Sequence, residues 1–231
     1  IYHHGNYLYH LTNKDAVNFK LVRSPLGRGH EELIIPNRES TYLMEVTLFK
    51  NHMAVLERIE GNLAIRVFDF QQESWNALEM EEDIYSVEFD ANYDWNSEFL
   101  RISYGSFVTP FSIFDIDLGT HKKTLKKREE ILGGYDPNNY VTERIWAPTH
   151  DGKKVAITLL YKKGIDLQGN NPCFLWGYGS YGSTYDPWFS SNIFSMVDRG
   201  VVYARAHIRG SSFLGRQWYL DGRLEHKKNT F

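Results

Sequence analysis

The first 130 residues or so consist of short runs in which apolar and polar residues alternate, separated by polar turns. A period of two is typical of strands with one buried face, and no helical period is visible here. The runs recur along the chain: Tyr7–Leu11, Met53–Leu56 and Phe99–Ile102 begin at residues 7, 53 and 99. Two further sets repeat at similar intervals, namely Phe19–Val22, Ala64–Val67 and Phe111–Phe114, then Glu32–Ile35, Trp75–Leu78 and Lys122–Leu125.

A repeat in the forties with about four strands per unit indicates a β-propeller. Each blade of a propeller is a small sheet that buries its faces only against neighbouring blades. Three units are too few to close a ring, because closed propellers have at least about four blades. We therefore predict a partial propeller of three four-stranded antiparallel blades over residues 1–132, with further blades expected upstream of Ile1.

The pattern changes after the third repeat. Residues 133–140 combine two glycines with a turn dipeptide and polar side chains, which is typical of a linker between domains. Two strands are then predicted at Val141–Ala147 and Lys154–Tyr161, joined by a tight turn. Residues 141–231 therefore open a second domain.

Further strands and a helix follow in that domain. Residues 188–197 carry apolar side chains at helical spacing, and Val201–Ile208 is predicted to be a strand. A strand, a helix and a strand in this order form a parallel crossover, so the second domain begins as an α/β sheet. The predicted fold class is thus β plus α/β in separate domains.

The stretch Pro172–Gly182 joins an apolar run to three glycines. Cys173–Trp176 is predicted to be a buried strand, with Cys173 as a small buried residue. The glycines at positions 177, 179 and 182 permit a positive φ or a close approach to another group. The product is a rigid loop that presents Tyr178, Ser180 and Tyr181.

The same glycines match the dinucleotide-binding pattern, with Asp198 near the distance of a ribose-binding acid. That site needs a helix that opens at the third glycine, but Gly182 is followed by the turn dipeptide Asp186-Pro187. It also needs its acid at the end of the second strand, whereas Asp198 precedes the next apolar run. These two misplacements argue against a nucleotide site, and no cofactor is expected.

A set of motifs extends along the chain: Gly177–Gly182, Asp198–Gly200, Ala206–Gly210, Leu214–Tyr219 and Lys227–Phe231, together with Gly134–Tyr140, Thr142–Trp146 and Asp151-Gly152. These motifs, and more loosely Asn13–Ala16 and Asn18–Leu21, resemble the prolyl oligopeptidase family of serine peptidases, and its oligopeptidase B branch in particular. The resemblance spans nearly the whole chain. It implies a β-propeller joined to an α/β-hydrolase domain, and an enzyme that cuts short peptides, in this branch after Arg or Lys.

A hydrolase of this class carries its nucleophile on a Gly-x-Ser-x-Gly turn, followed by an acid and a histidine. No such turn occurs in the chain, and His207 comes too early to be the base. The resemblance implies that the Ser/Asp/His triad lies beyond Phe231, so the segment alone is expected to be inactive. It also implies that the Tyr178 hydroxyl donates a hydrogen bond to the oxyanion and that Tyr181 lies near the primary substrate pocket. Without the resemblance, Tyr178 would be interpreted as one packed aromatic among many.

One loop departs from the family pattern. The family usually reads Arg-Gly-Gly, then Gly or Ser, then Glu-Leu-Gly, whereas residues 209–215 read Arg-Gly-Ser-Ser-Phe-Leu-Gly. Phe213 thus replaces the glutamate, which leaves the conformation of the loop open. We interpret His207 and Arg209 as structural, and expect the Arg209 guanidinium to pair with a carboxylate at the end of its strand.

Composition narrows the possible partners and leaves two alternatives. The 26 basic and 29 acidic side chains give a net charge of −3, which favours neither nucleic acid nor an anionic membrane. The spacing of His3, His4 and His10 matches no common metal-ligand set. A single cysteine and the absence of a long apolar run or a leader pattern favour a cytoplasmic location. The resemblance to the family implies that the partners are short peptide substrates. Prolyl specificity, or a non-catalytic binding or scaffold module, remain alternatives, and the oligomeric state stays open.

Overall fold

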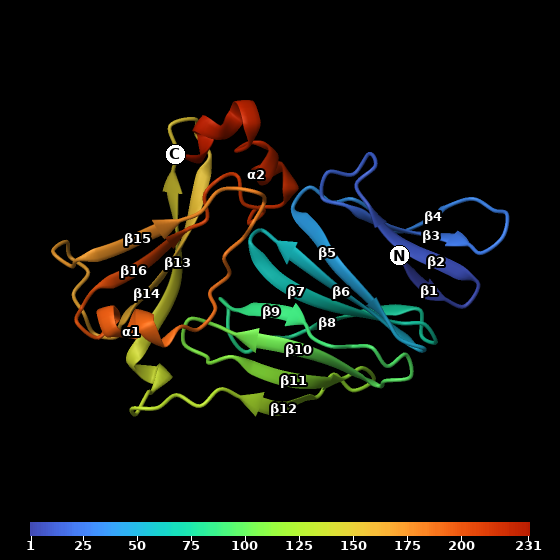
Figure 1. Cartoon of the computed structure of the whole chain (residues 1–231), viewed down its shortest axis with the longest axis horizontal. Coiled ribbons are helices and arrows are strands. Elements are labelled where there is room, and N and C mark those ends of the chain that lie inside the picture. The colour runs from blue at the N-terminus through green and yellow to red at the C-terminus, as the bar shows by residue number, and fades with distance from the viewer.

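The computed structural model describes all residues 1–231, which form four sheets of four strands each (Figure 1). The first three sheets are antiparallel meanders in sequence order. Their strands are β1 (Tyr2–His4), β2 (Tyr7–Thr12), β3 (Lys20–Pro25) and β4 (Glu32–Ile35); β5 (Thr41–Leu48), β6 (His52–Ile59), β7 (Asn62–Asp69) and β8 (Ser74–Leu78); and β9 (Ser86–Phe89), β10 (Phe99–Gly105), β11 (Ser112–Asp117) and β12 (Lys123–Arg128). The predicted partial propeller of three blades is confirmed.

The middle blade shows why a propeller strand can carry apolar residues at consecutive positions. On β6, Met53 and Val55 pack in a cluster with the first blade, while Ala54 and Leu56 pack in a cluster with the third. Both faces of the strand are therefore buried, and its apolar run is continuous. Side-by-side blades thus supply each other's cores, as a propeller requires.

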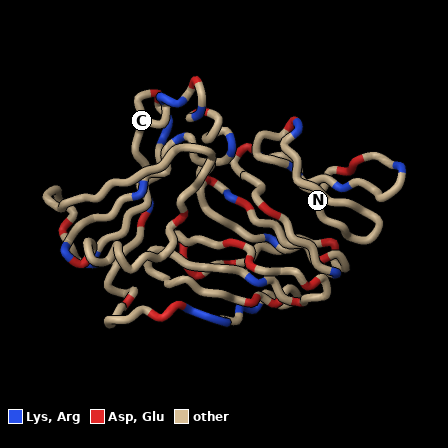
Figure 2. The backbone as a smooth tube through the Cα atoms, viewed as in Figure 1, with Lys and Arg blue, Asp and Glu red and all other residues tan.

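The basic run Lys122–Arg128 lies mainly on β12, which is the edge strand of the third blade. Charged side chains on an edge strand oppose pairing with the edge of another sheet. Figure 2 shows charges of both signs spread over the whole backbone. None of the helices is both long enough and apolar enough to span a membrane.

The fourth sheet has the order β13-β14-β16-β15, where β13 is Tyr140–Pro148, β14 is Lys154–Lys162, β15 is Cys173–Gly177 and β16 is Val202–Ala206. Strands β15 and β16 are parallel and are joined by helix α1 (Ser191–Val197), so the predicted crossover is confirmed. The carboxyl end adds α2 (Arg216–Leu220) and a 3₁₀ segment, η2 (Leu224–Thr230), while a shorter one, η1 (Pro137–Asn139), precedes β13.

Helix α1 begins later than the apolar spacing from residue 188 predicts. Trp188 and Phe189 lie in the extended segment before it. Trp188 packs on Phe111 of the third blade with ring centroids 5.9 Å apart, and Phe189 packs on Phe194 of the helix itself at 5.2 Å. These aromatic contacts, rather than helical hydrogen bonds, account for the apolar character of the first residues.

The prediction that Cys173–Trp176 is a buried strand is right about the strand and wrong about its burial. Cys173 is exposed, and the exposed fractions of Phe174 and Leu175 are 45% and 64%. The reason is the position of β15 at the edge of the fourth sheet, where β16 is its only neighbour and α1 packs on β16 and β14 instead. An apolar run reveals that a strand forms, but not whether its faces are covered.

A buried ion pair connects the propeller blades to the fourth sheet. Arg58 of β6 is 2% exposed and donates two hydrogen bonds of 2.7 Å to the carboxylate of Asp186, which lies 128 residues later. Arg205 of β16 donates a third, of 2.7 Å, to the Asp186 carbonyl. Arg144 of β13 also bonds the side chain of Asn62. The fourth sheet therefore has a defined position against the middle blade.

Candidate functional site

The candidate site lies where the parallel strands β15 and β16 end. Loops leave the carboxyl ends of both strands at the same edge, which is where open α/β sheets place their binding sites. The loop Gly177–Gly182 runs beside the loop that follows β16: Gly182 N donates to Gly210 O at 2.9 Å, and Ser212 N donates to Gly182 O at 3.1 Å. Two segments thirty residues apart thereby form one surface.

Three glycines let the backbones of this cluster touch. A Cβ on Gly179 would lie 2.2 Å from the Arg209 carbonyl oxygen. One on Gly210, whose φ is +88°, would lie 2.1 Å from the Gly179 carbonyl oxygen, and one on Gly222 would lie 2.3 Å from the Gly210 nitrogen. The close approach predicted for the glycine-rich loop is present at Gly179, and Gly182 takes the predicted positive φ, +71°.

The two tyrosines predicted from the resemblance sit on this loop in different surroundings. Tyr178 is half-buried and packs edge to face on Tyr185, with centroids 5.4 Å apart, and its hydroxyl makes no hydrogen bond within the chain. Tyr181 is 86% exposed, has a φ of 60°, and lines a pocket of about 260 Å³ with Tyr219 and Arg223. A positive φ is uncommon for a bulky residue, so the cluster holds Tyr181 in an unusual conformation.

Lys227 is a site residue that the sequence analysis did not single out. Its ammonium group donates hydrogen bonds to the Gly179 carbonyl and, at 2.8 Å, to the Ser180 hydroxyl. The only signal in the sequence was its position in the family-like motif Lys227–Phe231. Its partner loop lies 47 residues earlier, so no local pattern could have revealed the contact.

Arg209 fixes the end of the β16 segment, and the expected carboxylate partner is Asp151. The buried guanidinium donates to both Asp151 oxygens, at 2.5 and 3.2 Å, and its Nε donates to the Asn229 carbonyl at 2.9 Å. Hydrogen bonds from Arg209 hold the pKa of Asp151 well below its usual range. One side chain thus joins the β13–β14 turn, the β16 loop and η2.

His207 is a structural residue. It is 4% exposed, its ring stacks on Phe213 at a centroid distance of 3.7 Å, and Nε2 lies 2.8 Å from the Thr158 hydroxyl. Burial, with the nearby arginines 144, 205 and 58, lowers its pKa to about 2. A histidine that stays neutral and enclosed fits the interpretation that it is not the catalytic base.

Phe213 fixes the conformation of the loop at residues 209–215, where the sequence departs from the family pattern. The side chain is fully buried, and the guanidinium groups of Arg144 and Arg58 lie 5.0 and 5.7 Å from its ring centroid. A Cβ on Gly61, in the β6–β7 turn, would lie 2.3 Å from the ring. The loop is therefore anchored by an aromatic ring against the middle blade, with cations over its face.

The shifted pKa of His207 predicts an acid-sensitive fold. Between the unfolded value of 6.5 and the folded value of about 2, the unfolded chain binds a proton that the folded chain does not. The free energy of unfolding should therefore fall as the pH drops below 6.5, by up to about 1.4 kcal/mol per pH unit from this group. Urea titrations from pH 7 to 4 should show a shallower decline for His207→Gln. The exposed His226→Gln is the control and should keep the wild-type slope; equal slopes for all three would contradict the assignment.

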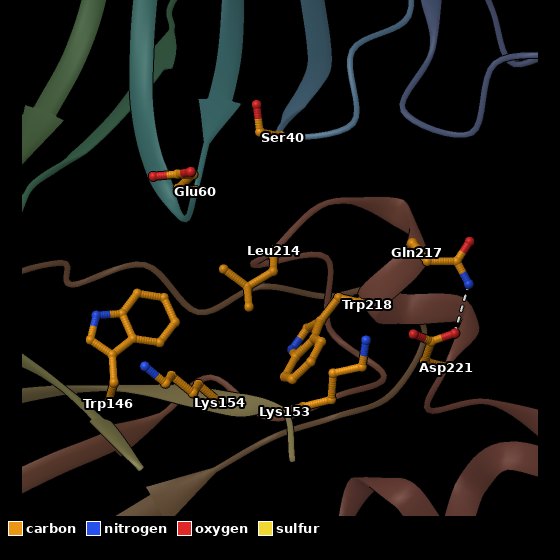
Figure 3. Close-up of a pocket in the computed structure, with 9 residues that line it drawn as sticks. All are labelled: Ser40, Glu60, Trp146, Lys153, Lys154, Leu214, Gln217, Trp218 and Asp221. Carbon is orange, nitrogen blue, oxygen red and sulfur yellow. Dashed lines mark hydrogen bonds between the residues drawn. The ribbon is translucent and has the colours of Figure 1, made fainter. Parts of the chain in front are cut away.

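A larger pocket of about 560 Å³ lies between the blades and the fourth sheet (Figure 3). Ser40 and Glu60 face it from the propeller side, and Trp146 and Trp218 are among the side chains on the other side. Neither Tyr178 nor Tyr181 lines it. This pocket is a gap in the interface between the two parts, separate from the candidate site.

Nowhere do three or more His, Cys, Asp or Glu side chains gather in a way that could hold a metal ion. Of the histidines singled out in the sequence, His4 stacks on Phe70 at 3.9 Å and hydrogen-bonds the Lys50 carbonyl at 3.0 Å. His10 lies 3.2 Å from the Glu31 carboxylate. These side chains serve packing and surface hydrogen bonding.

Two family models match the chain. The model for "Prolyl oligopeptidase, N-terminal beta-propeller domain" matches residues 1–129, which is more than half of the chain. The chain belongs to the prolyl oligopeptidase family. A second model, "Prolyl oligopeptidase family", matches residues 187–231, from just before α1 to the end of η2. The resemblance drawn from the motifs is thereby confirmed.

Individual members of the prolyl oligopeptidase family align over nearly all of the chain. Dipeptidyl aminopeptidase BI of Pseudoxanthomonas mexicana is 39% identical over 95% of the chain, and Protease 2 of Moraxella lacunata is 34% identical over 96%. The structure of oligopeptidase B from Leishmania major superposes with a TM-score of 0.92 at 34% identity, covering 99% of this chain and 34% of that one. The chain spans about a third of these curated relatives, 31% and 32% of their lengths.

Proposed function

We propose that the whole protein is a cytoplasmic serine oligopeptidase that hydrolyses short peptides after Arg or Lys through an acyl-enzyme. The observation that carries the proposal is Tyr178, a half-buried phenol without an internal hydrogen-bond partner, held on a glycine-rich loop at the carboxyl edge of a parallel strand pair. Membership of the prolyl oligopeptidase family supports peptide hydrolysis. The likeness to oligopeptidase B from Leishmania major supports the basic specificity.

In this proposal the chain supplies the accessory chemistry and not the nucleophile. The Tyr178 hydroxyl donates a hydrogen bond to the oxyanion of the tetrahedral intermediate, a contact typically worth about 3 kcal/mol of barrier. Tyr181 contributes to the pocket for the residue before the cut. The triad is supplied by residues outside 1–231. The blades are assigned to residues 1–132, the linker to 133–140 and the hydrolase portion to 141–231.

The direct test is an assay of the whole protein with fluorogenic peptides that differ only in Arg, Lys or Pro before the leaving group. We expect turnover after Arg and Lys, and covalent labelling by a fluorophosphonate. The segment 1–231 should take up no label, because it contains no Gly-x-Ser-x-Gly turn. Turnover confined to Pro would favour the prolyl alternative. A folded whole protein that is neither labelled nor active would be a binding or scaffold module.

A second candidate function is the release of dipeptides from a free amino terminus. It is favoured by the relative named dipeptidyl aminopeptidase BI, which is 39% identical over 225 residues. One change in the substrate distinguishes the two activities. An Arg-containing dipeptide substrate is assayed with its amino terminus either free or blocked by an acyl group. An oligopeptidase should hydrolyse the blocked substrate as readily as the free one, whereas a dipeptide-releasing enzyme should lose the blocked one.

A further inference from the structure

The middle of the Tyr178 loop has few polar contacts of its own. From Tyr178 to Tyr181, no amide donates a hydrogen bond to the chain. The backbone bonds at the end of the loop are Gly182 N to Gly210 O and Ser183 N to Ser180 O, at 2.9 and 3.1 Å. The loop is packed closely at Gly179 but is otherwise open, since Tyr181 is 86% exposed. Its conformation therefore depends on the few groups that reach it from outside.

Lys227 is the side chain that reaches it. Its Nζ donates to the Gly179 carbonyl and to the Ser180 hydroxyl, which belong to the two residues that follow Tyr178. An ammonium group has three donors, and charge-assisted bonds of this kind are stronger than neutral ones. Two of the three N–H donors of Lys227 thus bond the loop that carries both tyrosines.

The backbone that carries Lys227 is itself anchored. Asn229 accepts a hydrogen bond from Arg209 Nε at 2.9 Å, and its side-chain amide donates to the Asp221 carbonyl at 3.1 Å. The buried Thr230 hydroxyl donates to the Gly222 carbonyl at 3.0 Å. The lysine therefore projects from a fixed segment, so its ammonium group can hold the loop rather than follow it.

We propose that Lys227 is a positioning residue that holds the Tyr178 loop in its working conformation. It acts through Tyr178, by fixing the two residues that follow the phenol, and makes no contact with the oxyanion itself. This inference rests on the proposed function for its catalytic consequence. Its structural content, that Lys227 orders the loop, stands apart from the identity of the reaction.

The test in the whole protein compares Lys227→Met with Lys228→Met. The Lys228 side chain is exposed and has no hydrogen-bond or ion-pair partner, so its variant removes the same charge one position away. Lys227→Met should lower kcat about 10- to 100-fold, because small displacements of a catalytic group are costly, with KM changed less than about 3-fold. Lys228→Met should stay within about 2-fold of wild type. A loss that appears mainly in KM would make Lys227 a substrate contact and overturn the proposal.

A double-mutant cycle with Tyr178→Phe tests whether Lys227 acts through the phenol. If it does, adding Lys227→Met to Tyr178→Phe should lower kcat by less than about 3-fold further. The same 10- to 100-fold factor in both backgrounds would overturn the inference. If Lys227→Met does not fold, Ser180→Ala removes one of the two acceptors and should give a smaller loss of kcat with the same dependence on Tyr178.

Hydrogen exchange separates this inference from the proposed function. The amides of Gly182 and Ser183, which donate to the Gly210 and Ser180 carbonyls, should exchange at least about 10-fold faster in Lys227→Met than in wild type, and should be unchanged in Lys228→Met. If the loop loosens but no peptidase activity is found in any variant, the proposed function fails and the positioning role stands. If activity is found but exchange is unchanged, the positioning role fails and the proposed function stands.

Discussion

Tyr178→Phe in the whole protein should lower kcat by about 10- to 1000-fold while changing KM much less. The hydroxyl bonds the oxyanion only as negative charge develops, so its loss raises the barrier without weakening substrate binding. The free energy of unfolding should change by no more than about 1 kcal/mol. Tyr178 is half-buried, and the substitution removes only its hydroxyl, which has no hydrogen-bond partner in the chain. Steady-state kinetics with an Arg-containing fluorogenic peptide and a thermal melt measure the two effects.

Tyr185→Phe is the matched control for this experiment. Tyr185 packs against the Tyr178 ring, is 46% exposed and loses the same atom. Its kcat should stay within about 2-fold of wild type, since its hydroxyl has no proposed role in the oxyanion site. Full kcat in Tyr178→Phe, or a loss found wholly in KM, would show that Tyr178 is a packing or substrate-binding residue.

Gly210→Ala should be the most disruptive single substitution in the loop cluster. The new Cβ would lie 2.1 Å from the Gly179 carbonyl oxygen at a φ of +88°, so one of the two backbones must move. We expect a loss of at least about 3 kcal/mol in the free energy of unfolding. In the whole protein, displacement of the Tyr178 loop should lower kcat at least about 100-fold. Urea titration and steady-state kinetics are the measurements.

Gly200→Ala separates the clash from the cost of the backbone conformation alone. Gly200 has a similar φ, +85°, and nothing within 4 Å of the position its Cβ would take. It should cost about 1 kcal/mol, as expected for a positive φ in open space, and leave kcat unchanged. Equal effects of the two substitutions would mean that the close contact of Gly179 and Gly210 contributes nothing beyond conformation.

The sequence was sufficient to predict the blades, because a strand in a repeated sheet is encoded by the spacing of neighbouring residues. The runs beginning at residues 7, 53 and 99 became β2, β6 and β10, each the second strand of its blade. The crossover from β15 through α1 to β16 was likewise predicted from local periodicity. Assignments of this kind need no knowledge of distant parts of the chain.

Burial was less predictable than secondary structure. Met53–Leu56 and Cys173–Trp176 are both apolar runs, yet the first is enclosed between two blades and the second lies on a sheet edge. The burial of each run depends on which elements pack beside it, and the sequence of the run alone does not specify those elements. For the same reason Trp188 and Phe189, which match the spacing of α1, lie in the extended segment before the helix.

The candidate site shows the same division. The glycines at 177, 179 and 182 indicated a constrained loop, and the family motifs predicted roles for Tyr178 and Tyr181 on it. The partners that hold the cluster came only from the tertiary structure, because they are far away along the chain. Lys227 reaches Ser180 across 47 residues, Arg209 reaches Asp151 across 58, and Arg58 reaches Asp186 across 128. Local sequence determines which conformations a segment favours, whereas long-range charge pairing and close backbone contact depend on the completed fold.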